Sequence, residues 1–266
     1  MVDPMTDATA KEETVSFGFE EIAVEEKEAR VHGVFASVAS RYDVMNDLMS
    51  AGIHRLWKHD TMARVNPQPG ERLLDVAGGT GDLAKAFLDR ADRAGKRRAH
   101  APEATAVVCD INEEMLAAGK ERKEMAPYGE RLSWVCGNAE ALPFADKSFD
   151  ALTIAFGIRN VTHRDKALSE FHRVLKPAGR LAVLEFSHMT VPALQAAYDT
   201  YSFNVIPRLG SLVAGDRESY QYLVESIRRF PKQGDFQAEV EAAGFRNVSV
   251  TNFSGGIAAL HFGWKV

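Results

Sequence analysis

The sequence predicts an α/β protein with a mostly parallel seven-stranded sheet, an antiparallel last strand, a helical N-terminal segment and a helical insertion. Short apolar segments alternate with segments of helical pattern, which is typical of a parallel sheet covered by helices on both faces. This rhythm changes at the end of the chain, where residues 245–266 contain two strand-like runs joined around Gly255-Gly256, a hairpin signal. A closing hairpin on a parallel sheet makes one strand antiparallel to its neighbours.

The regular elements begin after the turn signal NPQPG at 66–70. The apolar runs predicted as parallel strands lie at 72–78, 105–110, 132–137, 149–157 and 180–187. Helices are expected between them at about 81–94, from Asn112 onward, and at roughly 164–176. Glu113 and Glu114 in the first turn of the second helix favour its start at Asn112.

Length and composition predict a single domain. With 266 residues, 45% of them hydrophobic, the chain is long enough to bury one large core. Residues 1–16 are expected to form a disordered tail, followed by one domain over 17–266, in which 17–65 supplies N-terminal helices. The aromatic-rich insertion 188–232 is expected to act as a lid. Because it follows the carboxyl end of a strand, we expect it to help form an apolar substrate pocket; packing on the sheet is the alternative.

Charge and composition exclude several classes of function. A net charge of −5 and a pI near 5.9 argue against a nucleic-acid partner. The eight histidines show no metal-ligand spacing, so no metal is expected. No run approaches the roughly 20 apolar residues of a membrane span, and the N-terminus resembles neither a signal nor a transit peptide. The sequence predicts a cytoplasmic protein, with peripheral contact at the inner face of a membrane left open.

The stretch LLDVAGGTGD at 73–82 raises the question of what its glycine-rich turn holds. A phosphate-binding loop needs Gly-Lys-Ser/Thr after the glycines, which this sequence lacks, and the dinucleotide pattern GxGxxG has Ala84 in place of its last glycine. The better match is Asp-x-x-x-Gly-x-Gly, formed by Asp75, Gly79 and Gly81. In methyltransferases this turn lets the backbone approach the amino-acid part of S-adenosylmethionine, which bears no phosphate.

Two later strand ends support a nucleoside cofactor. Asp110 ends the second predicted strand, where a carboxylate can accept hydrogen bonds from both ribose hydroxyls, although an NAD enzyme would use the same contact. After the third strand, Asn138 can bond the adenine amino group and Ala139 can offer its backbone amide. Asn138 is also a common turn former. Together with the glycine turn, these positions predict S-adenosylmethionine as the cofactor.

Several longer segments are more specific than the glycine turn. They are YDVMNDLMSAGIHRLWK (42–58), LDVAGGTGD (74–82), FGIRNVTHRDKAL (156–168), RVLKPAGRLAVLEFS (173–187), YSFNVIPRLG (201–210) and SYQYLVESIRRFPKQ (219–233). These segments resemble the ubiquinone/menaquinone biosynthesis C-methyltransferase family, and the match runs from about Phe17 to the C-terminus. The resemblance implies a class I methyltransferase, Rossmann-like fold and methyl transfer to a ring carbon of a polyprenylated quinol. The acceptor would be demethylmenaquinol, 2-polyprenyl-6-methoxy-1,4-benzoquinol, or both.

The resemblance also implies cofactor contacts by position. Combined with the glycine turn, the expected contacts are Asp75, Gly79, Thr80, Gly81, Asp110, Asn138, Ala139 and Ala155. Three alanines depart from the family pattern, since Ala155 replaces a serine, and Ala77 and Ala178 replace glycines. The missing hydroxyl removes any side-chain contact at Ala155, and the turn at Ala178 requires a φ that alanine can adopt.

A quinol attacks a methyl donor effectively only once its hydroxyl loses a proton, and a phenol has a pKa of about 10. We expect Arg159 to stabilise the quinolate with Asn160 beside it; a structural arginine bridging loops is the alternative. His163 has the pKa range of a general base. The residues expected near the pocket mouth, as substrate contacts or alternative bases, are Tyr42, His54, Glu185 and Tyr201. Water is a further candidate, and the sequence does not decide among them.

Two other functions compete with this one. A non-catalytic assembly subunit of a quinone-biosynthesis complex would keep the fold, but would not need intact Gly79, Asp110 and Asn138. An NAD-dependent oxidoreductase is disfavoured by the closing hairpin and the broken GxGxxG pattern. Because a prenyl tail is apolar, we also expect transient contact with a membrane surface or handover from other quinone-pathway enzymes. The oligomeric state stays open.

Overall fold

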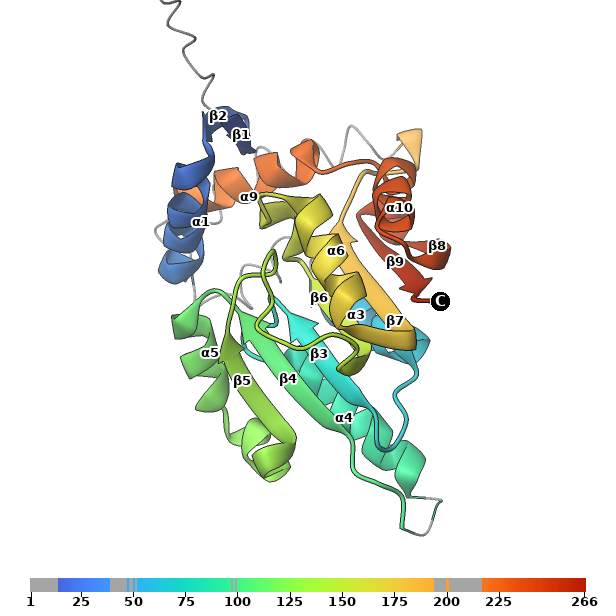
Figure 1. Ribbon diagram of the computed structural model, residues 1–266. Helices are drawn as coiled ribbons and strands as arrows, with labels where there is room; N and C mark the ends of the chain where they lie inside the picture. Colours follow the sequence, from blue (N-terminus) through green and yellow to red (C-terminus); the bar gives the residue numbers. More distant parts are fainter. Residues whose placement is uncertain are drawn as a thin grey trace, which may run out of the picture.

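The computed structural model places a seven-stranded sheet at the centre of the molecule (Figure 1). It describes residues 14–38, 47, 50, 52–96, 98, 100–193, 200 and 217–266. The strands are β3 (Arg72–Val76), β4 (Thr105–Asp110), β5 (Leu132–Cys136), β6 (Phe149–Ala155), β7 (Leu175–Phe186), β8 (Arg246–Phe253) and β9 (Ala258–Trp264). Their order is β5-β4-β3-β6-β7-β9-β8, and β9 is antiparallel to both neighbours. The predicted mostly parallel sheet with an antiparallel last strand is confirmed.

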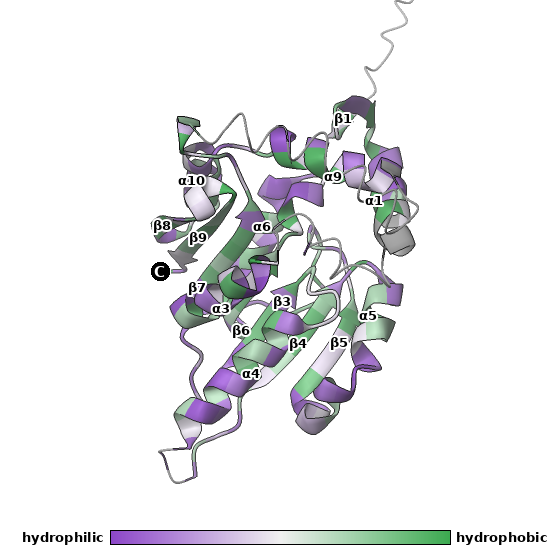
Figure 2. Cartoon of the chain, turned by 180° about the vertical axis from the view of Figure 1, so that it is seen from behind, coloured by the Kyte–Doolittle hydropathy of each residue, from purple (hydrophilic) through white to green (hydrophobic). Residues whose placement is uncertain are grey.

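The central strands are apolar throughout because helices cover both faces of the sheet. Leu73 and Leu74 of β3 are fully buried and belong to the cores on opposite faces. One core includes residues of α3 (His54–Val65), α4 (Asp82–Gly95), α5 (Glu113–Lys120) and α9 (Arg217–Arg229). The other includes residues of α6 (Arg164–Val174) and α10 (Gln233–Ala242). Figure 2 shows the hydrophobic strands between helices that carry many hydrophilic residues.

Two local signals are confirmed by the structure. The side chain of Asn112 caps α5, where its Oδ1 accepts a hydrogen bond from the backbone N–H of Met115 at 2.9 Å. Strands β8 and β9 are joined through the predicted glycine pair, in which Gly255 and Gly256 have φ of 69° and 98°. The helix cap and the hairpin turn therefore both follow from the residues that form them.

The start of the folded chain differs from the prediction. Residues Thr14–Phe17 (β1) and Glu20–Ala23 (β2) pair as an antiparallel hairpin, and α1 (Val24–Val38) begins only after it. The predicted tail over 1–16 therefore extends too far by three residues, and the segment 17–65 is not helical at its start. A short hairpin is marginal in isolation, so its stability must come from other parts of the chain.

The hairpin is stabilised by α9. The ring of Phe17 stacks on Tyr222 with their centroids 4.1 Å apart, and Glu225 accepts a hydrogen bond from the backbone N–H of Phe19 at 3.0 Å. In Figure 1, α1 and α9 lie together beyond the carboxyl ends of the parallel strands, and they are in contact. The N-terminal and C-terminal parts of the chain thus meet above the sheet.

Helix α9 lies within the predicted insertion 188–232, of which residues 194–199 and 201–216 fall outside the described residues. The lid function of this insertion stays a prediction. Within the described ranges, the structure has no helix that is both long and apolar enough to cross a membrane.

Ala178 adopts a left-handed backbone conformation with a φ of 60°, at a position where the family resemblance implies glycine. The residue is exposed, and its N–H donates to the carbonyl of Lys265 at 2.7 Å. A left-handed alanine costs about 1–2 kcal/mol, while glycine loses about 0.4–1 kcal/mol more entropy on folding. Ala178→Gly should therefore raise the free energy of unfolding by about 0.5–1 kcal/mol in a urea titration. The control Ala182→Gly, within buried β7, should lower it, and a destabilised Ala178→Gly protein would contradict the assigned φ.

Candidate active site

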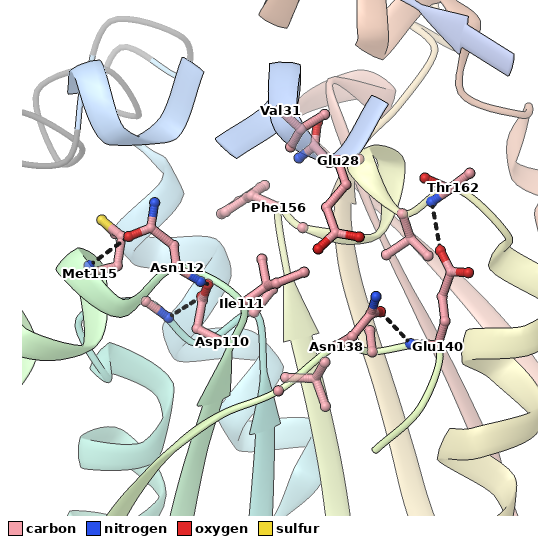
Figure 3. Close-up of a pocket in the computed structure, with 18 residues that line it drawn as sticks. Glu28, Val31, Asp110, Ile111, Asn112, Met115, Asn138, Glu140, Phe156 and Thr162 are labelled. Carbon is pink, nitrogen blue, oxygen red and sulfur yellow. Dashed lines mark hydrogen bonds between the residues drawn. The ribbon is translucent and has the colours of Figure 1, made fainter. Parts of the chain in front are cut away.

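A cleft with about 130 Å³ of space open to water lies at the carboxyl ends of the parallel strands (Figure 3). Residues that follow β3, β4, β5 and β6 line it, and α1 covers it with Glu28 and Val31. Open α/β sheets bind ligands at this edge. The described lining residues include the carboxylates of Glu28, Asp110 and Glu140 but no lysine or arginine. Such a lining disfavours a phosphate group and suits a neutral or cationic ligand.

The glycine-rich turn after β3 brings the backbone close to this cleft. Gly79 lines the cleft with a φ of 53°, and a Cβ there would lie 2.9 Å from Met115 Cε. The conformation therefore favours glycine, whereas the flexible end of Met115 could shift to admit a Cβ. Gly81, with a φ of 83°, precedes α4, and a Cβ there would lie 2.8 Å from the ring of Trp134. Gly81 is not among the described residues that line the cleft; its packing against Trp134 accounts for the glycine, and the cofactor contact stays a prediction.

Asp110, at the end of β4, is held by backbone N–H groups. Its Oδ2 accepts from Gly79 and its Oδ1 from Asn112, both at 2.9 Å. Burial raises the pKa of the carboxyl group, and the backbone donors oppose this effect. Each carboxylate oxygen has a second lone pair, so both oxygens stand at the cleft in fixed positions from which they can accept a pair of hydroxyl groups.

The loop after β5 lies opposite Asp110 (Figure 3). Asn138 and Ala139 both line the cleft, as predicted for adenine contacts. The Oδ1 of Asn138 accepts from the backbone N–H of Glu140 at 2.8 Å, so this residue also forms the turn that was the alternative. Its amide nitrogen points away from this turn, toward the side of Glu28 (Figure 3). Glu140 in turn accepts from the backbone N–H of Thr162 at 3.0 Å.

A smaller hollow, with about 20 Å³ of space open to water, adjoins the cleft, and Ala77 and Phe156 line both. The predicted cofactor contacts that line this hollow are Asp75, Thr80 and Ala155. Lys58 and Asp82 line it as well. Ala77 and Phe156 have left-handed φ values of 48° and 58°, so strained backbone marks the junction of the two spaces.

Asp75 is a buried carboxyl group in this hollow. It is 1% exposed and accepts a hydrogen bond from the hydroxyl of Thr153 at 2.6 Å. Burial raises the pKa of Asp75 to about 7, although Thr153 and Lys58 act in the opposite direction. An unfolded aspartate titrates near 3.9, so folding takes up a proton between about pH 4 and pH 7. The free energy of unfolding therefore decreases as the pH rises through that window, because the unfolded state gives up this proton more readily than the folded state.

Asp75→Asn keeps an acceptor for Thr153 and removes the titration. At pH 8 the ligand-free variant should be a few kcal/mol more stable than wild type, whereas at pH 5 the difference should fall to about a third of that value. Urea denaturation at both pH values measures this difference. A gain that is the same at pH 5 and pH 8 would show that Asp75 does not titrate in this range.

Of the predicted catalytic residues, Asn160 lines the cleft, and its Oδ1 accepts from the hydroxyl of Tyr222 at 3.0 Å. Arg159 is not among the described lining residues. Its buried guanidinium lies 2.8 Å from Glu185 Oε1 and also donates to the carbonyl of Phe156. Burial raises the pKa of Glu185, an effect that Arg159 offsets in part. This geometry favours the alternative of a structural arginine, and it pairs Glu185 internally instead of placing it as a substrate contact.

Two predicted histidines lie away from the cleft. His163 precedes α6 and lines a separate surface hollow, because the chain turns outward there to start the helix. His54 is buried within α3, and its Nδ1 is 3.1 Å from Ser50 Oγ. Neither is among the described lining residues, so the geometry does not support His163 as a base or His54 as a substrate contact. Tyr42 and Tyr201 lie outside the described residues.

Sequence reasoning missed several residues of the site. Glu28 and Val31 come from α1, and no local pattern shows that this helix covers the cleft. Phe156 belongs to an apolar run that predicts the end of a strand, not a residue of the site. Lys58 is the residue of this group whose position gave an indication of function. It lies one turn from both His54 and Met62 on the buried face of α3, where a charged side chain is uncommon.

Comparison with known proteins gives consistent results. A model of the ubiE/COQ5 methyltransferase family matches residues 23–265. A Paracoccus denitrificans protein named ubiquinone/menaquinone biosynthesis C-methyltransferase is 58% identical over 250 residues, covering 94% of this chain and 96% of its own. A mitochondrial protein of Danio rerio, named 2-methoxy-6-polyprenyl-1,4-benzoquinol methylase, is 53% identical over 274 residues, which cover 94% of this chain and 84% of its own.

Solved structures share the fold at low identity. A SAM-dependent methyltransferase from Aquifex aeolicus is 17% identical with a TM-score of 0.54, over 79% of this chain and 89% of its own. The cyclase SpnF also gives a TM-score of 0.54, at 16% identity, over 88% of this chain and 94% of its own. Because one of the two is named as a cyclase, this likeness establishes the architecture and not the reaction.

Proposed function

Because the chain belongs to the ubiE/COQ5 methyltransferase family and is an S-adenosylmethionine-dependent C-methyltransferase, we propose that its acceptor is a polyprenylated quinol. The acceptor is demethylmenaquinol, 2-polyprenyl-6-methoxy-1,4-benzoquinol, or both, in line with the names of its relatives. The observation that carries this proposal is the cleft at the strand ends, whose charged lining residues, within the described ranges, are all carboxylates.

The residues of the cleft fit S-adenosylmethionine. The two fixed oxygens of Asp110 suit the ribose hydroxyls, and Asn138 with Ala139 suits adenine. Asp75 offers a buried carboxylate to the ammonium group of the methionine part, in the adjoining hollow. When bound, the cofactor supplies an electrophilic methyl group. The described lining of the cleft contains no cation, which disfavours binding of a phosphate-bearing nucleotide in the cleft.

Asn160 is the residue that we propose to meet the quinolate oxygen. It lines the cleft, and Tyr222 fixes its side chain. Arg159 acts indirectly in this proposal, because its ion pair with Glu185 and its bond to the carbonyl of Phe156 hold the loop that carries Asn160. Methylation of a quinolate neutralises a cation and an anion, so exclusion of water from the cleft favours the reaction. Alignment of the ring carbon with the methyl donor further increases the rate of methyl transfer.

We also propose that the protein works in the cytoplasm and touches the inner face of the membrane transiently. The polyprenyl tail of the acceptor is apolar and resides in lipid. Ile53 and Leu56 at the start of α3 are 45% and 53% exposed, and their apolar side chains suit such contact.

Methyl transfer from labelled S-adenosylmethionine to short-chain naphthoquinol and benzoquinol analogues tests the proposal. Label should appear on a ring carbon, and only when a reductant keeps the acceptor as a quinol. Activity on one ring type or on both identifies the acceptor. Tight cofactor binding without transfer to either ring would overturn the proposal and favour the assembly subunit.

A further inference from the structure

We infer that Lys58 binds the carboxylate of the methionine part of S-adenosylmethionine in the hollow beside the cleft. This inference rests on the proposed function and assigns a residue to one end of the cofactor. Its starting point is a difference in charge between the two spaces. The described lining of the cleft holds three carboxylates and no cation, whereas that of the hollow includes the ammonium group of Lys58 beside the carboxyl groups of Asp75 and Asp82.

Lys58 occupies a position where a lysine is uncommon. It lies on the packed face of α3, one turn from His54 and Met62, which are 1% and 0% exposed, and its own side chain is only 14% exposed. Lysine is rarely buried to this extent unless it has a charged partner. The partner here is Asp82, whose Oδ2 lies 2.9 Å from Lys58 Nζ. This ion pair directs the ammonium group to the wall of the hollow.

Asp82 is shared between two cations. Its Oδ1 lies 2.7 Å from a guanidinium nitrogen of Arg122, which also donates to the hydroxyl of Thr80. Burial alone would raise the pKa of Asp82, but Lys58 and Arg122 lower it to about 2. The carboxylate is therefore ionised under all working conditions and keeps Lys58 in place. An ammonium group has three donor hydrogens, so one lysine can serve Asp82 and a ligand carboxylate together.

The hollow adjoins the end of the cleft that Ala77 and Phe156 line. Asp110 lies in the cleft, Lys58 lies in the hollow, and Ala77 and Phe156 line both spaces between them. A ligand whose ribose is held at Asp110 therefore places its other end beside Lys58 and Asp75. In S-adenosylmethionine and S-adenosylhomocysteine this end is a zwitterion, with one ammonium and one carboxylate. The hollow is lined by the acidic Asp75 and Asp82 and the basic Lys58. Asp75 complements the ammonium group, and Lys58, held by Asp82, complements the carboxylate.

The test compares S-adenosylhomocysteine with its decarboxylated analogue, which keeps the amine and lacks the carboxylate. Isothermal titration should show that Lys58→Met weakens S-adenosylhomocysteine binding about 10- to 100-fold. Binding of the analogue should change by less than about twofold. The matched control is Lys85→Met, which breaks the Lys85–Asp89 pair at 2.8 Å on α4 and should leave both affinities unchanged. Lys58→Arg should retain most of the affinity for S-adenosylhomocysteine.

Equal losses for both ligands in Lys58→Met would overturn the inference, because they would mean that Lys58 acts through the fold or through Asp82. No loss for either ligand would overturn it as well. The decarboxylated analogue reports correct folding within the same protein, so a damaged variant is recognised at once. Wild-type protein that bound neither ligand would instead overturn the methyltransferase function on which this assignment rests.

Discussion

Replacing Arg159 with methionine should lower the free energy of unfolding by about 3–5 kcal/mol, because it leaves Glu185 buried without its cation. Both side chains are 1% exposed, and their charged groups lie 2.8 Å apart. The variant also loses the bond to the carbonyl of Phe156. Urea denaturation measures the loss, which should be smaller at pH 5 than at pH 8, since an unpaired buried Glu185 takes up a proton more readily at low pH.

Two further variants separate this effect from a general loss of charge. The double variant Arg159→Met/Glu185→Leu should recover most of the stability, because apolar groups of similar volume replace the buried pair. Arg164→Met breaks a part-exposed pair with Glu239 at 2.9 Å and should cost no more than about 1 kcal/mol. If Arg159→Met were as stable as wild type and only slowed methyl transfer, Arg159 would contact the quinolate directly and the positioning role would be wrong.

Replacing Asp110 with asparagine should weaken S-adenosylhomocysteine binding by about 100-fold, or 3 kcal/mol. Both carboxylate oxygens accept from backbone N–H groups, of Gly79 and Asn112, at 2.9 Å. An asparagine turns an NH₂ group toward one of these donors and removes the charge that strengthens hydrogen bonds to ribose hydroxyls. Hydrogen bonds to charged groups contribute about 1.5–3 kcal/mol each, so losing two accounts for the effect.

Isothermal titration measures this affinity, and Asp92→Asn is the matched control. Asp92 pairs with Arg131 at 2.8 Å, and both residues are absent from the described lining of the cleft. The control should bind as wild type does. An Asp110→Asn protein with wild-type affinity would show that the ribose is not held at the end of β4.

Much of the fold follows from local sequence. The apolar runs of the parallel strands, the Asn112 cap and the glycines at 255–256 act over a few residues, and each was predictable from its own segment. The positions of Asp110, Asn138 and Ala139 were predictable for a related reason. Residues at the carboxyl ends of neighbouring parallel strands must meet at one edge of the sheet, whatever else the chain does.

Direction and burial of side chains beyond the strand ends were not predictable in the same way. The hairpin at 14–23 depends on contacts with α9, so its own residues do not reveal it. Arg159 and His163 are close in sequence, yet a short turn buries one against Glu185 and directs the other outward. Glu28 reaches the cleft only because α1 packs across it, which is a property of the whole fold.

The contact between the N-terminal hairpin and α9 also fixes when the site is completed during synthesis. Phe19 and Glu225 are 206 positions apart, and α1 touches the same late helix. Protein chains emerge from the ribosome N-terminus first, so the segment that covers the cleft is made first but acquires its support near the end. A nascent chain that ends before Arg217 contains the ends of the parallel strands that line the cleft. It lacks α9, the helix that contacts α1 and the N-terminal hairpin. The chain can therefore enclose the cofactor only when its synthesis is nearly finished.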